Sequence, residues 1–208
     1  MVPSSTPAGF VRFVRGLTFD AASTPFAPMI TISRSLGILA VAIACLLSPA
    51  HGADAPTQFK VSNLAFQRPP AWEWVATQSQ MRKAQLKVPN PAGAAGEIVF
   101  FHFGPNNGGG TQANVDRWFR QFQGTKEQIK ARTEEGKAGT AKVTYVFAEG
   151  TYLSGMPGEA PTPKPDSALV GAIVEDPEGS VFVKYTGPKA LVTATTADFK
   201  KLVEGAKH

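Results

Sequence analysis

The sequence predicts an α+β domain in which two amphipathic helices pack on a largely antiparallel sheet. Apolar residues alternate with period two over several short segments, and the period becomes helical twice, after residue 110 and after residue 188. The turn sequence 176–179, Asp-Pro-Glu-Gly, joins two of the strands as a hairpin, so these strands must be antiparallel. The order of strands, helix, strands and helix, without internal repeats, favours one domain of this class.

The domain begins with two predicted extended segments. Residues 59–66 alternate well enough to form a first strand, which Arg68 and two prolines end. Residues 72–77 form the second segment, and Trp72 and Trp74 lie on one face of it because side chains repeat every two residues.

Two strands and the first helix follow. Residues 81–88 predict a strand with one solvated face, and residues 97–103 predict a central strand that is apolar on both faces. The helix begins near Thr111, and its exposed face is expected to include Asn114 and Arg117. Its buried stripe has the spacing i, i+3, i+4 and i+7 and consists of Val115, Trp118, Phe119 and Phe122.

The second half of the chain repeats this order. Residues 124–140 are charged and weakly patterned, which indicates a solvated connection. Residues 141–153 predict a long strand with a bulge at Gly150, and the prolines of residues 154–166 predict an exposed loop. The predicted hairpin strands are 168–175 and 180–186, and the last helix opens at Pro188 and ends at Gly205. Its expected buried face is Leu191, Val192, Phe199, Leu202 and Val203.

Residues 29–52 have the three parts of a secretory signal peptide. Arg34 gives positive charge, residues 36–47 are an uncharged apolar run, and small residues precede a cut before Ala53. This run is shorter than the roughly 20 residues that a membrane-spanning helix needs. We therefore expect a secreted or periplasmic domain, residues 53–208, with residues 1–28 as an upstream extension or a disordered segment. A buried core helix and lipidation of Cys45 are the alternatives for this segment.

The composition of the predicted mature chain excludes several classes of function. Residues 53–208 carry 18 Lys and Arg against 15 Asp and Glu, so their net charge is 18 minus 15, or +3. That charge is too small to indicate a nucleic-acid partner, and no stretch combines clustered basic residues with aromatic ones. The only cysteine, Cys45, lies within the predicted signal peptide, so the mature domain is expected to have no disulfide and no cysteine metal ligand.

The loop before the first helix resembles a phosphate-binding motif. From Gly104 it reads G-x-x-x-x-G-G-T, and glycine stands at position 110, where the phosphate-binding pattern has a lysine. This substitution argues against a nucleotide site. Free N–H groups at the helix start still favour a weak anion or ligand site, the other interpretation being a flexible loop capped by Thr111 or Asn114. The candidate ligand-binding residues are Gly108, Gly109, Gly110, Thr111, Asn114 and Arg117.

Other candidate sites have simpler structural explanations. His102 is the only internal histidine of the mature chain, too little for a metal site or a catalytic triad. Glu175, Asp176 and Glu178 belong to the predicted turn, which explains them better than calcium binding does. The tryptophans suggest either a sugar-stacking platform or core positions. We therefore predict no catalytic residue, no metal site and no cofactor.

Several segments together resemble a family of uncharacterised secreted bacterial proteins. They are Leu64-x-Phe66, Pro70-x-Trp72, Met81-Arg82-x-Ala84, the strand FFHFG, residues 113–118 with Gln121-Phe122, Gly150-Thr151-Tyr152, residues 171–179, and Phe182-Val183-Lys184 with the Thr-Gly-Pro that ends at 188. The resemblance covers roughly residues 62–204. The order of elements also looks like the PsbP-like fold, and this second resemblance implies an exported accessory protein without catalysis.

The expected function is that of an exported, non-enzymatic accessory or binding domain. Its partner would be an unknown protein or small ligand in the cell envelope, bound at the glycine loop and the first turn of the helix. Two alternatives remain open: an envelope hydrolase that uses His102 with a carboxylate, and a lipid-anchored structural component of the envelope.

Overall fold

The computed structural model describes residues 55–155 and 160–208. These residues all lie in one compact unit, Ser48–His208. The predicted signal peptide, Cys45 and the predicted extension 1–28 lie outside the described residues, so export and lipidation stay predictions. Within the described ranges, no helix has both the length and the apolar character needed to cross a bilayer.

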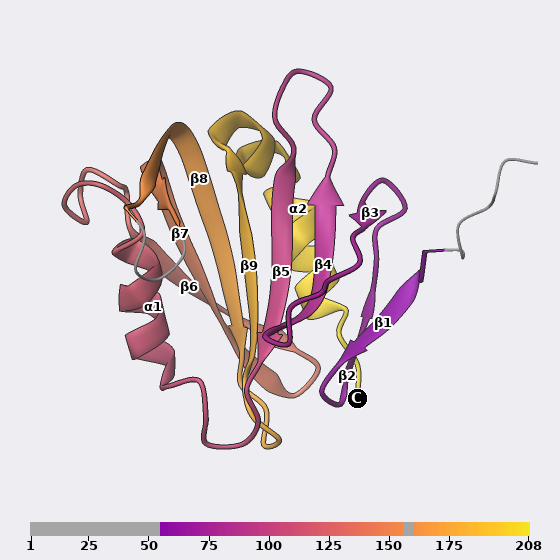
Figure 1. The fold of residues 1–208 in the computed structure, drawn as a ribbon. Coiled ribbons are helices and arrows are strands. Elements are labelled where there is room, and N and C mark those ends of the chain that lie inside the picture. The colour runs from indigo at the N-terminus through magenta and orange to yellow at the C-terminus, as the bar shows by residue number, and fades with distance from the viewer. Residues whose placement is uncertain (1–54, 156–159) are drawn as a thin grey trace, which may run out of the picture. The chain divides into compact units, whose positions relative to one another are not determined.

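A seven-stranded antiparallel sheet forms the centre of the domain (Figure 1). Every neighbouring pair of strands is antiparallel, which confirms the predicted α+β class. In spatial order the strands are β3 (Glu73–Trp74), β4 (Arg82–Val88), β5 (Gly96–His102), β9 (Val181–Pro188), β8 (Thr162–Val174), β7 (Ala141–Ser154) and β6 (Arg132–Ala138).

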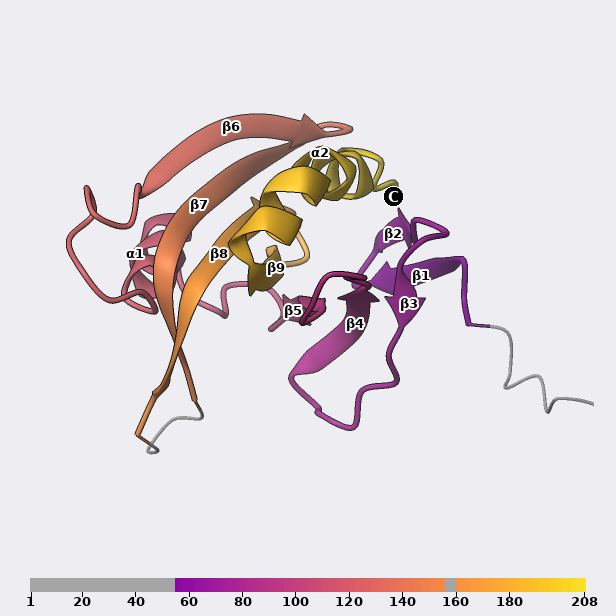
Figure 2. The same cartoon turned by 90° about the horizontal axis from the view of Figure 1, so that it is seen from above.

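Two helices and a hairpin cover the two faces of this sheet. Helix α1 (Thr111–Phe119) packs on one face, called here the α1 face, and α2 (Lys189–Glu204) packs on the opposite face, the α2 face. The hairpin of β1 (Gln58–Val61) and β2 (Leu64–Gln67) adds its apolar side chains to the core on the α2 face. Figure 2 shows the curved sheet between the two helices.

The core on the α2 face forms where the apolar sides of the central strands meet α2. Tyr185 and Phe199 have ring centroids 5.8 Å apart, and both side chains are fully buried. The predicted buried face of α2 is confirmed for Val192, Phe199, Leu202 and Val203, whereas Leu191 is half-buried. Each buried side chain of this size contributes about 1.5–3 kcal/mol to folding.

The core on the α1 face depends on one close contact between a tryptophan and a glycine. The predicted stripe of Val115, Trp118, Phe119 and Phe122 is buried, as expected. Trp118 lies directly on Gly171 of β8, where an added Cβ would stand 2.1 Å from the indole ring. Only glycine leaves room for the ring at this position, so the pair fixes how closely α1 approaches the sheet.

The hairpin and the bulge were predicted correctly. The turn 176–179 closes with a hydrogen bond from the Gly179 amide to the Asp176 carbonyl, 2.9 Å long. The register of β7 and β8 shifts between Gly150 and Tyr152, where the bulge was expected. Strand β5 lies inside the sheet between β4 and β9, as its two apolar faces indicated.

Three predictions about local structure were wrong. Residues 59–66 do not form one strand: Ser62 has φ 56°, and the segment folds into the β1–β2 hairpin. Residues 124–140 are not only a connection, because they contain the edge strand β6, which pairs with β7. The many charged side chains of β6 gave no apolar alternation from which a strand could be predicted. The loop predicted for 154–166 ends early, since β8 begins at Thr162 despite its prolines.

Candidate functional site

The glycine loop that leads into α1 is held closed by Asn114. This side chain was expected to face water, but it is only 3% exposed. Its Nδ2 donates to the carbonyl oxygens of Gly108, Gly109 and Gly110 at 2.9, 3.3 and 3.1 Å. Its Oδ1 accepts a 2.8 Å hydrogen bond from Arg117. Asn114 therefore binds the loop from inside rather than presenting its amide to a ligand.

Replacing Asn114 with alanine is expected to lower the free energy of unfolding by about 1–3 kcal/mol, because several buried hydrogen bonds lose their partner. The change is measured by urea unfolding. Arg120→Ala is the matched control, since it truncates an exposed arginine at the end of the same helix and should change stability by less than about 0.5 kcal/mol. Equal stability of Asn114→Ala and the wild type would show that the side chain does not hold the loop.

The first turn of α1 already faces a carboxylate of the same chain. The N-cap is Gly110 and makes no side-chain cap, so neither Thr111 nor Asn114 caps the helix as expected. The Thr111 hydroxyl instead donates to Glu175 at 2.9 Å. A negative charge at a helix start is favourable, and Glu175 supplies it. This contact weakens the case for an external anion at the predicted site.

His102 has the surroundings of a structural histidine. It lies at the end of β5, and its Nε2 makes a 3.0 Å hydrogen bond with the main-chain carbonyl oxygen of Glu178. A hydrolase would need a carboxylate or a substrate cavity beside this ring, whereas the hydrogen bond of His102 goes to a main-chain carbonyl.

Asp176 stabilises the turn 176–179, as the turn sequence predicted. Its carboxylate is fully buried and contacts His208 at 2.7 Å and the amide of Glu178 at 2.9 Å. Burial alone would raise the pKa of Asp176, but the hydrogen bonds from the Glu178 amide, His208 and Asn63 outweigh burial and hold this pKa below its ordinary value. In the described part of the chain, no group of three or more His, Cys, Asp or Glu side chains could hold a metal ion.

Asp176→Asn is expected to be less stable than the wild type at pH 6, with a difference that shrinks as the pH falls. A carboxylate with a depressed folded-state pKa contributes stability above its ordinary pKa of about 3.9 and loses that contribution as it is protonated in the folded state. Urea unfolding between pH 6 and pH 2 measures the difference. A gap of constant size down to pH 2 would contradict this account.

The tryptophans belong to the core rather than to an exposed platform. Trp72 is buried, with its ring 6.3 Å from Tyr185, and Trp74 is half-buried against Phe59 at 5.3 Å. Trp118 fills the contact with Gly171. These positions leave no flat array of exposed indoles among the three.

Neither of the two described helices covers one half of the α1 face. Figure 1 shows α1 on the side of β6, β7 and β8, while β9, β5 and β4 stay uncovered on this face. Beyond the end of β9, the strands β7 and β8 continue as a two-stranded arm, residues 151–154 and 162–166. The arm is joined to the segment that follows α1 by main-chain hydrogen bonds from Leu153 to Gln121 and from Gln123 to Thr151, 2.7 and 3.0 Å long.

A cavity of about 630 Å³ lies between this arm and the loop that joins β4 to β5. Its volume is within the range of small-ligand sites. Prolines at 163, 165 and 188 and the ring of Tyr152 supply apolar surface, and charged side chains stand among them. Its lining is Ala94, Ala95, Glu97, Tyr152, Pro163, Lys164, Pro165, Asp166, Ser167, Thr186, Gly187 and Pro188.

A lysine on the central strand lies next to this cavity. Lys184 of β9 is half-buried, and its Nζ donates a 2.8 Å hydrogen bond to the hydroxyl of Tyr152, which lines the cavity. Burial lowers the pKa of Lys184 to about 8; the carboxylate of Glu97 opposes this shift, and the positive charge of Arg82 adds to it. Burial and Glu97 raise the pKa of the Tyr152 hydroxyl.

Glu97 has its own partners on β4. Arg82 forms a 2.7 Å ion pair with Glu97, and Gln85 donates to the same carboxylate oxygen at 2.9 Å. The carboxylate of Glu97 is thus shared with a guanidinium and an amide, and within residues 55–155 and 160–208 Lys184 forms no ion pair of its own. Among Arg82, Glu97 and Lys184, the ammonium of Lys184 is therefore the charge that is least well balanced by an opposite charge.

The residues of this site were missed in the sequence analysis. Glu97 stands within a strand that was predicted to be central, and Lys184 stands within an otherwise largely apolar predicted hairpin strand, where a buried charged side chain is costly. A charged residue inside an apolar strand could therefore have pointed to this site. Tyr152 could not be found, because its place over β9 depends on how the arm curves.

Comparison with known proteins shows a likeness of fold. No family model and no curated protein matches the sequence. The structure is similar to the solution structure of cyanobacterial PsbP (CyanoP) from Synechocystis sp. PCC 6803, with a TM-score of 0.46, 7% sequence identity and coverage of 75% of this chain and 95% of that chain. This is a similarity of fold alone, to a protein of the fold that the order of elements suggested. The family of secreted bacterial proteins stays a prediction.

Proposed function

We propose that the chain is an exported, non-enzymatic accessory domain that binds a ligand or a segment of a partner protein in the cavity beside Lys184. The observation that carries this proposal is the combination of a cavity of about 630 Å³ with a half-buried lysine that forms no ion pair among the described residues. A charged side chain whose burial lowers the stability of the fold is typical of a functional site.

The glycine loop is the second candidate for the binding site. Gly109 and Gly110 are exposed to solvent, and so is the neighbouring side chain of Arg117. Against it, the side chain of Asn114 already uses the loop carbonyls, and Glu175 already meets the first turn of the helix. No side chain of the described residues fills the cavity in a comparable way, and for this reason we favour it.

A pair of variants separates the two sites. Thr186→Arg places a long side chain into the cavity from its half-exposed wall, whereas Arg117→Ala alters only the glycine loop. Immobilised wild-type protein is incubated with an envelope extract, and bound molecules are compared between the three forms. We expect Thr186→Arg to lose what the wild type binds and Arg117→Ala to keep it. Loss with Arg117→Ala alone would assign binding to the glycine loop, and binding unchanged in both would contradict the proposal.

Export has its own test. The N-terminus of the protein recovered from the envelope is determined by mass spectrometry, and a chain that begins at Ala53 is expected. That result would exclude a lipid on Cys45, whereas a modified Cys45 at the N-terminus would favour the lipid-anchored alternative.

A further inference from the structure

Lys184 differs from the other lysines in its surroundings. It belongs to β9, which is paired with β5 and β8 on its two sides, so the strand that carries it is fixed in the sheet. Its register partners are Val99 on β5 and Gly171 on β8. The side chain is therefore flanked by an apolar residue and a glycine, and neither can stabilise an ammonium.

The amine end of Lys184 is held in a defined place. Its Nζ lies 2.8 Å from the hydroxyl of Tyr152 and 5.1 Å from the centre of the same ring. The other charged groups near it are Glu97 on β5 and Arg82 on β4, and these two form an ion pair with each other. Tyr152 and Glu97 line the cavity, and the amine contacts the cavity wall through the hydroxyl of Tyr152, although Lys184 itself is not one of the lining residues.

We propose that Lys184 captures an aldehyde as a reversible imine in the cavity. This inference names a ligand class for the site of the proposed function and rests on it. A lysine amine is activated as a nucleophile when its ammonium is desolvated or lies next to another cation, and the half-buried position beside Arg82 meets both conditions.

The reaction needs only the two partners. The lone pair of the neutral amine attacks the carbonyl carbon, the C=O π electrons move to oxygen, and a proton passes from nitrogen to that oxygen to give a carbinolamine. The hydroxyl then leaves with the second amine proton as water while the C=N bond forms. No oxidant or reductant is consumed, and hydrolysis reverses the capture.

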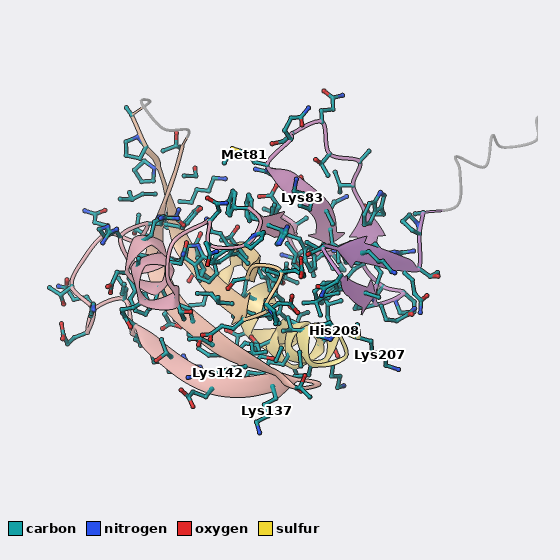
Figure 3. All side chains as sticks on the ribbon, turned by 90° about the horizontal axis from the view of Figure 1, so that it is seen from below. Met81, Lys83, Lys137, Lys142, Lys207 and His208 are labelled. Carbon is teal, nitrogen blue, oxygen red and sulfur yellow. The ribbon has the colours of Figure 1, made fainter. Side chains whose placement is uncertain are left out.

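The lowered pKa makes Lys184 distinct at neutral pH. With a pKa of about 8, about 10% of its amine is neutral at pH 7. An ordinary lysine, with a pKa of about 10.4, has about 0.04% neutral amine at that pH. Lys142 is a suitable internal control, because it is exposed and an ion pair with Glu135 raises its pKa. Figure 3 labels it on the face seen from below, together with Lys83, Lys137 and Lys207.

The test uses glyoxylate as the aldehyde and propanal as an uncharged second aldehyde. The whole protein is incubated with each aldehyde and with cyanoborohydride, which reduces imines to stable amines, and labelled lysines are identified by peptide mass spectrometry. At pH 7 we expect an initial rate at Lys184 at least about tenfold greater than at Lys142. The rate at Lys184 should level off above about pH 8, whereas that at Lys142 should continue to rise to pH 10.

The comparison is made within one wild-type molecule, so it does not depend on a variant that folds. Labelling of Lys184 at a rate equal to or below that of Lys142 with both aldehydes would overturn the inference. If Lys184 is unreactive while Thr186→Arg still abolishes binding from the extract, imine capture fails and the proposed binding site stands. If Lys184 reacts while Thr186→Arg has no effect on binding, the proposed function fails instead.

Discussion

Trp118→Ala is expected to lower the free energy of unfolding by about 3–5 kcal/mol, the usual range for removing a buried tryptophan. The indole is 6% exposed and fills the space above Gly171 that joins α1 to the sheet. In a domain of this size the loss corresponds to a fall in melting temperature of roughly 6–20 °C. Urea unfolding and calorimetry both measure it.

The glycine under the ring provides the matched test. In the wild type, Gly171→Ala should be destabilising by about 1–3 kcal/mol, because its Cβ would overlap the indole. In the Trp118→Ala background the same change should cost much less, since the space is then empty. The two changes are therefore expected to be strongly non-additive. Additive effects would show that the ring does not lie on this glycine in solution.

Lys184→Met is expected to stabilise the protein at pH 7 by about 2–3 kcal/mol when it is made in a Tyr152→Phe background. A shift of the lysine pKa from about 10.4 to about 8 corresponds to about 3 kcal/mol, at 1.36 kcal/mol per pH unit. Methionine keeps most of the length of the side chain without the charge. The Tyr152→Phe background removes the hydroxyl that would otherwise lose its hydrogen-bond partner.

The size of this effect depends on pH. Below about pH 8 the lysine is protonated in both states, so the folded protein carries the full cost of the buried charge. Between about pH 8 and 10.4 the unfolded chain binds a proton that the folded chain has lost, and stability rises with pH. The advantage of methionine should therefore be largest below pH 8 and should narrow toward pH 10.4, as followed by urea unfolding.

The exposed control for this variant is Lys142→Met. The Lys142 ammonium pairs with Glu135 at the surface, so its removal should change stability by less than about 1 kcal/mol. A Lys184→Met variant that is less stable than its background at pH 7 would contradict the account of Lys184 as a costly buried charge.

Much of the fold could be predicted from local patterns. The hairpin at 176–179, the bulge at Gly150 and the buried stripe of α1 each follow from residues close together in the sequence. Strand β6 could not be predicted in this way, because one edge of it faces solvent and its side chains are mostly charged. Its pairing with β7 is a property of the sheet and leaves little trace in periodicity.

The candidate site was harder to predict than the fold. The glycine loop resembled a functional motif, but the buried amide of Asn114 shows a structural use for it. Lys184 and Tyr152 are 32 positions apart in the sequence and meet only because the arm of β7 and β8 bends over β9. A contact of this kind depends on sheet curvature, and no spacing rule in the sequence encodes it.

The protonation of Lys184 tests the central claim most directly. The amine nitrogen and the adjacent carbon of each lysine can be followed by NMR from pH 6 to pH 11, with assignment of Lys184 by its loss in Lys184→Met. We predict that Lys184 titrates with a pKa of about 8, whereas Lys142 titrates above the ordinary lysine value of about 10.4. A Lys184 that titrates near 10.4 would show that its charge is well solvated, and the account of this site would be wrong.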